Sequence, residues 1–87
     1  MNVEAFENLG EAYAGLRKYA EALAASERAI NLQPSSPGAH YFAGVASAAL
    51  GQREQALTHL GKLKQLKADD YANLLADFIE KKAPGKQ

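Results

Sequence analysis

Several residue types are absent or scarce in this chain of 87 residues. There is no cysteine, which excludes disulfide bonds and thiolate chemistry. Val and Ile together occur only four times, which disfavours a sheet because β-branched residues favour strands. The ten acidic and ten basic side chains cancel, so no long-range field attracts nucleic acid or an anionic membrane surface. We therefore expect neither nucleic acid nor a membrane as a partner.

The chain also lacks an uninterrupted apolar run long enough to cross a bilayer. Its start, MNVEAFENLG, has no basic segment followed by an apolar core, so it does not look like a secretion signal, and a cytoplasmic location is the default expectation. Lys62, Lys64 and Lys67 form a local basic cluster without aromatic residues for base stacking. A solvent-exposed helix face is the simpler interpretation of these lysines.

What the chain has in abundance is helix formers. Ala occupies 18 positions and Leu 11, and both residues strongly favour helices. The length allows one small domain, close to the lower limit at which a chain buries enough apolar surface to fold without help. The composition predicts an all-α protein.

An internal repeat appears when residues 3–36 are laid over residues 37–70, a shift of 34. Chance coincidence in this composition would give roughly three identities in such a window, so a duplicated helical unit is the better explanation. The eight identical pairs are Ala5/Ala39, Gly10/Gly44, Ala12/Ala46, Ala14/Ala48, Leu16/Leu50, Ala22/Ala56, Leu23/Leu57 and Leu32/Leu66.

Each unit reads as two antiparallel helices. The spacing i, i+3, i+4, i+7 places Phe6, Leu9, Gly10 and Tyr13 on one helical stripe. A second stripe follows a break at AGLRK, where Gly15 is the expected helix terminator; its members are Tyr19, Ala22, Leu23, Ser26, Ala29 and Ile30. We expect Gly10 and Ala22 to face each other so that the two axes approach closely.

The order aromatic, Leu-Gly, Tyr, Ala, Ala and Pro resembles the tetratricopeptide repeat (TPR), a 34-residue helix-turn-helix unit. The matching residues are Phe6, Leu9, Gly10, Tyr13, Ala22, Ala29 and Pro34, with Ser26 where the family prefers an aromatic. The second unit matches at Gly44 and Ala56, conservatively at Leu60, and with Gly51 at the usual turn glycine; His40, Ala43, Ser47, Leu63 and Ala68 depart from the pattern.

The resemblance implies an α-solenoid fragment of two TPR units and a C-terminal capping helix. We expect one domain over residues 1–82, with repeats at 3–36 and 37–70, a capping helix at about 70–82 and a disordered tail at 83–87. Ser36 followed by Pro37 predicts the start of the second unit. The capping helix is expected to place five apolar residues on one covering face, namely Tyr71, Leu74, Leu75, Phe78 and Ile79.

No spacing of residues indicates catalysis, a metal or a cofactor. His40 and His59 are the two histidines and lie 19 residues apart on different expected helices. His40 takes a large-residue position of the repeat and reads as a packing histidine, whereas His59 is expected to be exposed on an outer helix. The chain is therefore not expected to be an enzyme.

By the resemblance, a peptide or partner segment would bind in a concave groove lined by the first helix of each pair. The positions that match the family's groove are Glu4, Glu7, Glu11, Ala14, Gly38, Tyr41, Val45, Ala48, Ala72, Leu75, Ile79 and Lys82. From these we predict six partner-binding residues: Glu4, Glu7, Glu11, Tyr41, Val45 and Leu75. Such a groove suits a partner that offers apolar side chains and a Lys or Arg.

Plainer interpretations stand beside this one. Glu4, Glu7 and Glu11 are also what a solvated helix face would carry, and Tyr41 and Val45 would also suit packing against the last helix. One subgroup of the family grips the C-terminal carboxylate of heat-shock chaperones; here Glu7, Glu11 and Phe42 occupy its clamp positions, so we expect no such binding.

A different class of function is self-association. Repeat arrays generally need about three units to bury a continuous core, and this chain has two and one further helix. Either the capping helix closes the stack, or two copies bury the face around Phe6 as a homodimer, or the chain is a fragment of a longer array.

Overall fold

The computed structural model describes residues 2–82 and contains five helices in that range: α1 (Val3–Gly15), α2 (Tyr19–Leu32), α3 (Pro37–Ala49), α4 (Arg53–Gln65) and α5 (Asp69–Lys82). The described range holds no strand, so the predicted all-α class is confirmed. The expected tail at 83–87 lies outside the described residues.

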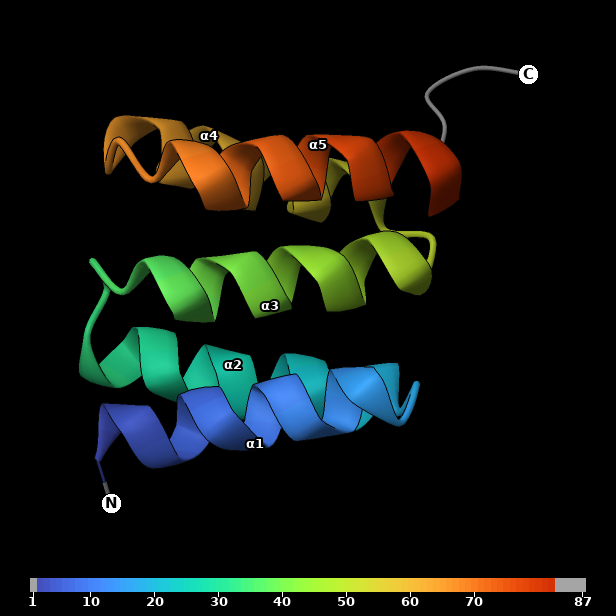
Figure 1. Ribbon diagram of the computed structural model, residues 1–87. Coiled ribbons are helices and arrows are strands. Elements are labelled where there is room, and N and C mark those ends of the chain that lie inside the picture. The colour runs from blue at the N-terminus through green and yellow to red at the C-terminus, as the bar shows by residue number, and fades with distance from the viewer. Residues whose placement is uncertain (1, 83–87) are drawn as a thin grey trace.

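The helices stack in series. Helices α1, α3 and α5 contact one another in that order, while α2 packs against α1 and α3, and α4 packs against α3 and α5 (Figure 1). Within residues 2–82, the outer helices α1 and α5 do not meet. This arrangement is that of a helical solenoid, in which each unit contacts only its neighbours.

Two helix starts follow the sequence signals. The Asn2 side chain accepts a hydrogen bond from the Ala5 N–H at 2.7 Å and caps α1. Ser36 caps α3 by accepting from the Ala39 N–H at 3.3 Å, and Pro37 occupies the first helical position. The predicted helix start at Ser36 and Pro37 is confirmed.

Three of the four connections are the same tight turn. Its left-handed residue is Arg17 (φ 62°), Gly51 (φ 82°) or Lys67 (φ 58°). In each turn the next residue's N–H closes back onto the helix in a Schellman motif, from Lys18 to Tyr13 (2.8 Å), from Gln52 to Ser47 (2.8 Å) and from Ala68 to Leu63 (2.9 Å). Helix α1 does end at Gly15, but the left-handed position is two residues later, so the glycine expected to terminate the helix does not make the turn.

The fourth connection, residues 33–36 between α2 and α3, has a different form. Gln33 and Ser36 have extended backbones, and Pro34 lies between them. This longer link separates the two helix pairs, whereas the tight turn joins helices within a pair.

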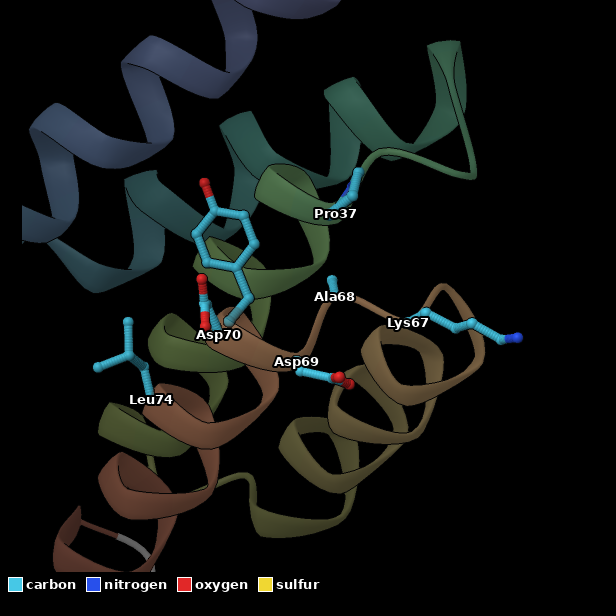
Figure 2. A pocket seen from close by; sticks show the side chains of 7 residues that line it. Pro37, Lys67, Ala68, Asp69, Asp70 and Leu74 are labelled. Carbon is cyan, nitrogen blue, oxygen red and sulfur yellow. The ribbon is translucent and has the colours of Figure 1, made fainter.

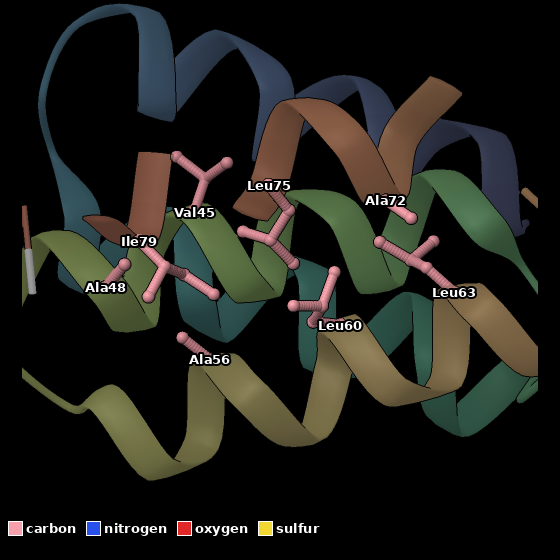
Figure 3. Packing of buried hydrophobic residues seen from close by; sticks show 8 residues of the cluster. All are labelled: Val45, Ala48, Ala56, Leu60, Leu63, Ala72, Leu75 and Ile79. Atoms are coloured by element: carbon pink, nitrogen blue, oxygen red, sulfur yellow. The ribbon is translucent and has the colours of Figure 1, made fainter. Parts of the chain in front are cut away.

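The larger core lies between α3, α4 and α5. Its buried members are Val45, Ala48, Ala56, Leu60, Leu63, Ala72, Leu75 and Ile79 (Figure 3). The smaller core joins α1, α2 and α3 through Phe6, Ala29 and Ala39. The apolar content of the stack is therefore uneven, with most of the large buried side chains at its C-terminal end.

Small residues allow close helix contacts. A Cβ added at Gly10 would lie 2.6 Å from the Ser26 Oγ and 3.7 Å from the Ala22 carbonyl oxygen, which agrees with the expected approach of α1 and α2. A Cβ added at Gly44 would lie 2.5 Å from a Leu75 methyl group. A Cβ at either glycine of the aligned pair Gly10/Gly44 would therefore force a neighbouring side chain to move.

Helix α5 presents a different face from the one expected. Its buried stripe is Ala72, Leu75 and Ile79, while Tyr71 and Leu74 are exposed. The prediction that Tyr71 and Leu74 belong to the covering face was wrong, because the tight turn at Lys67 starts α5 at Asp69, two residues before the 34-residue period would place it. No helix in the described part of the chain has the length and apolarity needed to cross a membrane.

Candidate protein-interaction surface

A surface hollow of about 540 Å³ lies where the N-terminal ends of α3 and α5 meet. Pro37 contributes from α3, Ala68 from the α4–α5 turn and Leu74 from α5 (Figure 2). Tyr71, in the first turn of α5, also lines the hollow. Lys67, Asp69 and Asp70 complete its lining. We call this the α3–α5 hollow; it combines apolar side chains with two carboxylates.

Aromatic rings support one wall of the α3–α5 hollow. The Tyr71 ring stacks on the Tyr41 ring with centroids 4.8 Å apart, and Tyr41 meets Phe42 edge to face at 5.0 Å. Burial, and then the neighbouring Tyr71, raise the pKa of Tyr41 above its ordinary value.

Asp69 and Asp70 give the α3–α5 hollow a negative edge. Both are exposed and stand in the first turn of α5, where carboxylates are stabilised by the positive end of the helix. Lys67 is the one cation in the lining, so acidic groups outnumber basic ones there. This edge suits a basic group beside an apolar contact.

The three predicted glutamates of α1 do not line this hollow. Glu4 and Glu11 are exposed, and Glu7 is half-buried. The Ser36 hydroxyl donates a hydrogen bond to Glu7 Oε2, and the Glu7 carboxylate lies 3.6 Å from where a Gly38 Cβ would be. Glu7 therefore joins α1 to the N-terminus of α3, an intramolecular role that the sequence did not indicate.

Two other predicted residues lie beneath the surface. Leu75 is fully buried and Val45 is 8% exposed, and both belong to the core between α3, α4 and α5. Their expected place on an open groove is corrected, because α5 turns its Ala72–Leu75–Ile79 stripe inward. Tyr41 packs partly against that core and meets Tyr71 on its outer side.

The residues that replace them were missed by the sequence reasoning. Pro37, Asp69, Asp70 and Leu74 line the α3–α5 hollow although none was a predicted site residue. The available signal was the length of the α4–α5 connection. No proline-containing link follows α4, so a tight turn and a shifted face of α5 could have been anticipated.

A second, smaller hollow of about 250 Å³ opens on the outer side of the α1–α2 pair. We call it the α1–α2 end hollow; Phe6, Leu9, Tyr13, Glu21, Ala24, Ala25 and Arg28 line it. Phe6 itself is 8% exposed and carries the Arg28 guanidinium 5.0 Å from its ring centroid. Leu9, 41% exposed, is the large apolar side chain that this end presents to solvent.

The two histidines meet between α3 and α4. The Nδ1 atoms of His40 and His59 lie 3.0 Å apart, and His40 Nε2 lies 2.7 Å from the Pro34 carbonyl oxygen. His40 is buried, as expected for a packing residue. The expectation that His59 is exposed was wrong: it is half-buried, and burial followed by the proximity of His40 lowers its pKa to about 4.

Helix pairs that are closed by tight turns and stacked in series, with a proline-containing link between the first two pairs, define a TPR-type helical repeat protein. A family model described as anaphase-promoting complex, cyclosome, subunit 3 matches residues 2–63, and the chain belongs to this family. The suspected TPR resemblance is thereby confirmed. No curated protein and no solved structure matches the chain at a significant level. Repeats of this type are generally non-enzymatic modules for protein–protein interaction.

Proposed function

We propose that the chain is an interaction module that holds a segment of a partner protein at the α3–α5 hollow. The observation that carries this proposal is the exposure of Tyr71 and Leu74, at 36% and 55%, beside the carboxylates of Asp69 and Asp70. Large apolar side chains on a helical surface are costly to leave in water, and their grouping with charges is typical of a recognition site. The family's general role in protein contact supports the same direction.

The chemistry of the hollow selects the partner. An apolar side chain of the partner would pack between Leu74 and the Tyr71 ring, over Pro37. A Lys or Arg next to it would reach Asp69 or Asp70, which fixes orientation and accelerates encounter more than it adds affinity. Glu4 and Glu11 are exposed on α1, so acidic side chains also lie at the other end of the α1–α3–α5 row.

In this proposal, the other predicted residues position the surface of the α3–α5 hollow. Tyr41 holds Tyr71 by stacking, and Val45 and Leu75 fix α3 against α5 from beneath. Glu7 sets the position of the α3 N-terminus, and therefore of Pro37. These residues would change partner affinity by moving the surface rather than by touching the partner.

A random peptide library displayed on phage tests the proposal. The wild-type chain is expected to enrich peptides in which an apolar residue lies near Lys or Arg. Leu74→Ala should weaken binding of the enriched peptides roughly tenfold, whereas Leu32→Ala should leave it unchanged. The two leucines are matched, since Leu32 is 51% exposed but lies at the end of α2. Absence of enrichment, or equal loss in both variants, would refute the proposed site.

Self-association is a second candidate, favoured by the α1–α2 end hollow. A second copy could bury Leu9 and the adjacent Ala24 in the way that a further repeat would. Sedimentation equilibrium over a wide concentration range should then show a dimer that Leu9→Glu abolishes and Leu57→Glu does not. Leu57, 36% exposed on α4, is a suitable control for Leu9 at 41%. A monomer throughout would reject this candidate and leave the α3–α5 hollow unaffected.

A further inference from the structure

The hydrogen bonds of the histidine pair determine which nitrogens carry protons. The Pro34 carbonyl can only accept, so the hydrogen of neutral His40 is on Nε2, which lies 2.7 Å from that oxygen. His40 Nδ1 is then a bare acceptor, and His59 Nδ1 donates to it across 3.0 Å. The two ring nitrogens that face each other are therefore joined by one exchangeable proton.

We propose that His40 and His59 form a two-histidine binding site for a borderline divalent transition-metal ion such as Zn²⁺, each ring binding through Nδ1. Zinc binds imidazole nitrogen at about 2.0–2.1 Å, so two such ligands in a tetrahedral site lie about 3.3–3.4 Å apart. The observed separation of 3.0 Å is slightly shorter, so binding requires the rings to move apart and to turn until both Nδ1 lone pairs point at the ion. In the bound form, the His59 proton moves from Nδ1 to Nε2, and both rings stay neutral.

The surroundings of His40 are those of a metal ligand. Ligating histidines usually donate their other ring N–H to a carbonyl or carboxylate, which fixes the ring and its tautomer. The His40 Nε2–H contact with the Pro34 carbonyl supplies this support before any ion arrives. His40 is also 6% exposed, so its ring is already held in place by packing.

Space for the remaining ligands lies beside the pair. A surface hollow of about 440 Å³ is lined by both histidines together with Thr58, Gly61, Lys62 and Gln65. Within residues 2–82, no third His, Cys, Asp or Glu joins the pair, so water would complete the coordination. Imidazole ligands favour zinc, copper and nickel over magnesium, which prefers oxygen.

The test uses the tag-free chain labelled with ¹⁵N at histidine. Because the sequence contains only two histidines, the imidazole NMR spectrum reports this pair and nothing else. At pH 7, Zn²⁺ is expected to shift both Nδ1 resonances together and saturate at one ion per chain, while Mg²⁺ leaves them unchanged. Ring resonances that do not move in Zn²⁺, or that move equally in Mg²⁺, would overturn the proposal.

Calorimetry with variants gives the second readout. His59→Gln removes one of the two proposed ligands, at a half-buried position. Loss of a hydrogen-bond partner of a ligand typically weakens metal binding roughly 10- to 100-fold, so loss of the ligand itself should weaken Zn²⁺ binding at least as much. Asp77→Asn, at an exposed position of α5 outside the hollows, is the control for binding at surface carboxylates and should keep the wild-type affinity for Zn²⁺. Unchanged affinity in His59→Gln would contradict the site. The wild-type NMR titration decides the question if that variant does not fold.

Discussion

At the scale of single residues, the same turn is built from different side chains. Gly51 adopts its left-handed conformation without steric cost, whereas Arg17 and Lys67 adopt it with a Cβ that crowds the backbone. The Schellman hydrogen bonds are nevertheless complete in all three turns. The hydrogen bonds of the turn and the packing of the helices that it joins therefore hold these two exposed residues in a strained conformation.

Replacing Arg17 by glycine should stabilise the fold. The left-handed strain would disappear, and the gain would be partly offset by the greater freedom of glycine in the unfolded chain, leaving about 0.5–1 kcal/mol. Urea denaturation measures this change. The reciprocal variant Gly51→Arg should lose a similar amount, and a lower urea midpoint for Arg17→Gly would show that the Arg17 side chain makes a compensating contact.

The half-buried His59 predicts a dependence of stability on pH. Its pKa falls from an ordinary 6.5 to about 4 in the folded chain, so the unfolded chain binds more protons in this window. The stabilisation is complete above pH 6.5 and is lost as the pH falls towards 4. Burial is the larger cause of the lowered pKa and the neighbouring His40 on α3 is the smaller one; Lys62 on α4 also lines this hollow.

Allowing for partial exposure, we expect the free energy of unfolding to fall by about 1 kcal/mol between pH 7 and pH 5. Few carboxylates titrate in this range, so the comparison isolates the histidines. Urea denaturation of His59→Gln, which keeps His40, should show a flatter pH profile than the wild type. Parallel profiles of the two proteins would mean that His59 does not carry the effect.

At the scale of elements, α5 is distinguished by how it enters the stack. Helices α3 and α4 leave Val45, Ala48, Leu60 and Leu63 to be covered, and the tight turn at Lys67 brings α5 directly onto them. The stripe of α5 that covers them consists of the small side chain of Ala72 and the large side chains of Leu75 and Ile79. Leu74, which immediately precedes Leu75 in the chain, points outward instead (Figure 2).

Leu75 and Leu74 are adjacent leucines with opposite environments. Leu75→Ala should destabilise the fold by about 2–5 kcal/mol, because it removes a fully buried side chain from the core and leaves a cavity. Leu74→Ala should cost less than about 0.5 kcal/mol. Thermal and urea denaturation of the two variants compare them directly. Similar losses in both would show that α5 covers the stack with a different face.

Much of this element level was predictable. The stripes of Phe6, Gly10 and Ala22, and the Ser36–Pro37 start, depend on local spacing and capping, which the sequence carries directly. The face of α5 was not predictable by analogy with α3, because it depends on the connection before it. A shift of two residues along a helix rotates its side chains by about 200°, which moves Leu74 from covered to exposed.

The candidate site was predictable only in its chemistry. An acidic and apolar character was expected from Glu4, Glu11 and Tyr41, and Asp69 with Leu74 supplies the same character elsewhere. The meeting of His40 with His59 joins residues from different helices, and such contacts follow from the crossing of α3 and α4 rather than from spacing along the chain. Spacing along the sequence predicts which residues share one face of a helix, but it does not predict which residues of two different helices meet.

At the scale of the whole molecule, two cores of unequal size share α3. The α3–α4–α5 core buries Leu60, Leu63, Leu75 and Ile79. The α1–α2–α3 core buries Phe6 and two alanines, with Val3 and Ile30 partly buried beside them. Because alanine burial removes little apolar area from water, we expect the first helix pair to be held to α3 by a smaller free energy than α5 is.

This imbalance has a consequence for amide hydrogen exchange. Because α1 and α5 do not touch, the first pair can detach while the other three helices remain assembled. The amides of α1 and α2 should therefore exchange with deuterium through a partial unfolding step. At low urea concentration, the rate of this exchange should hardly depend on urea. The amides of α3 and α4 should exchange only when the entire chain unfolds, so the molecule would come apart from its N-terminal end.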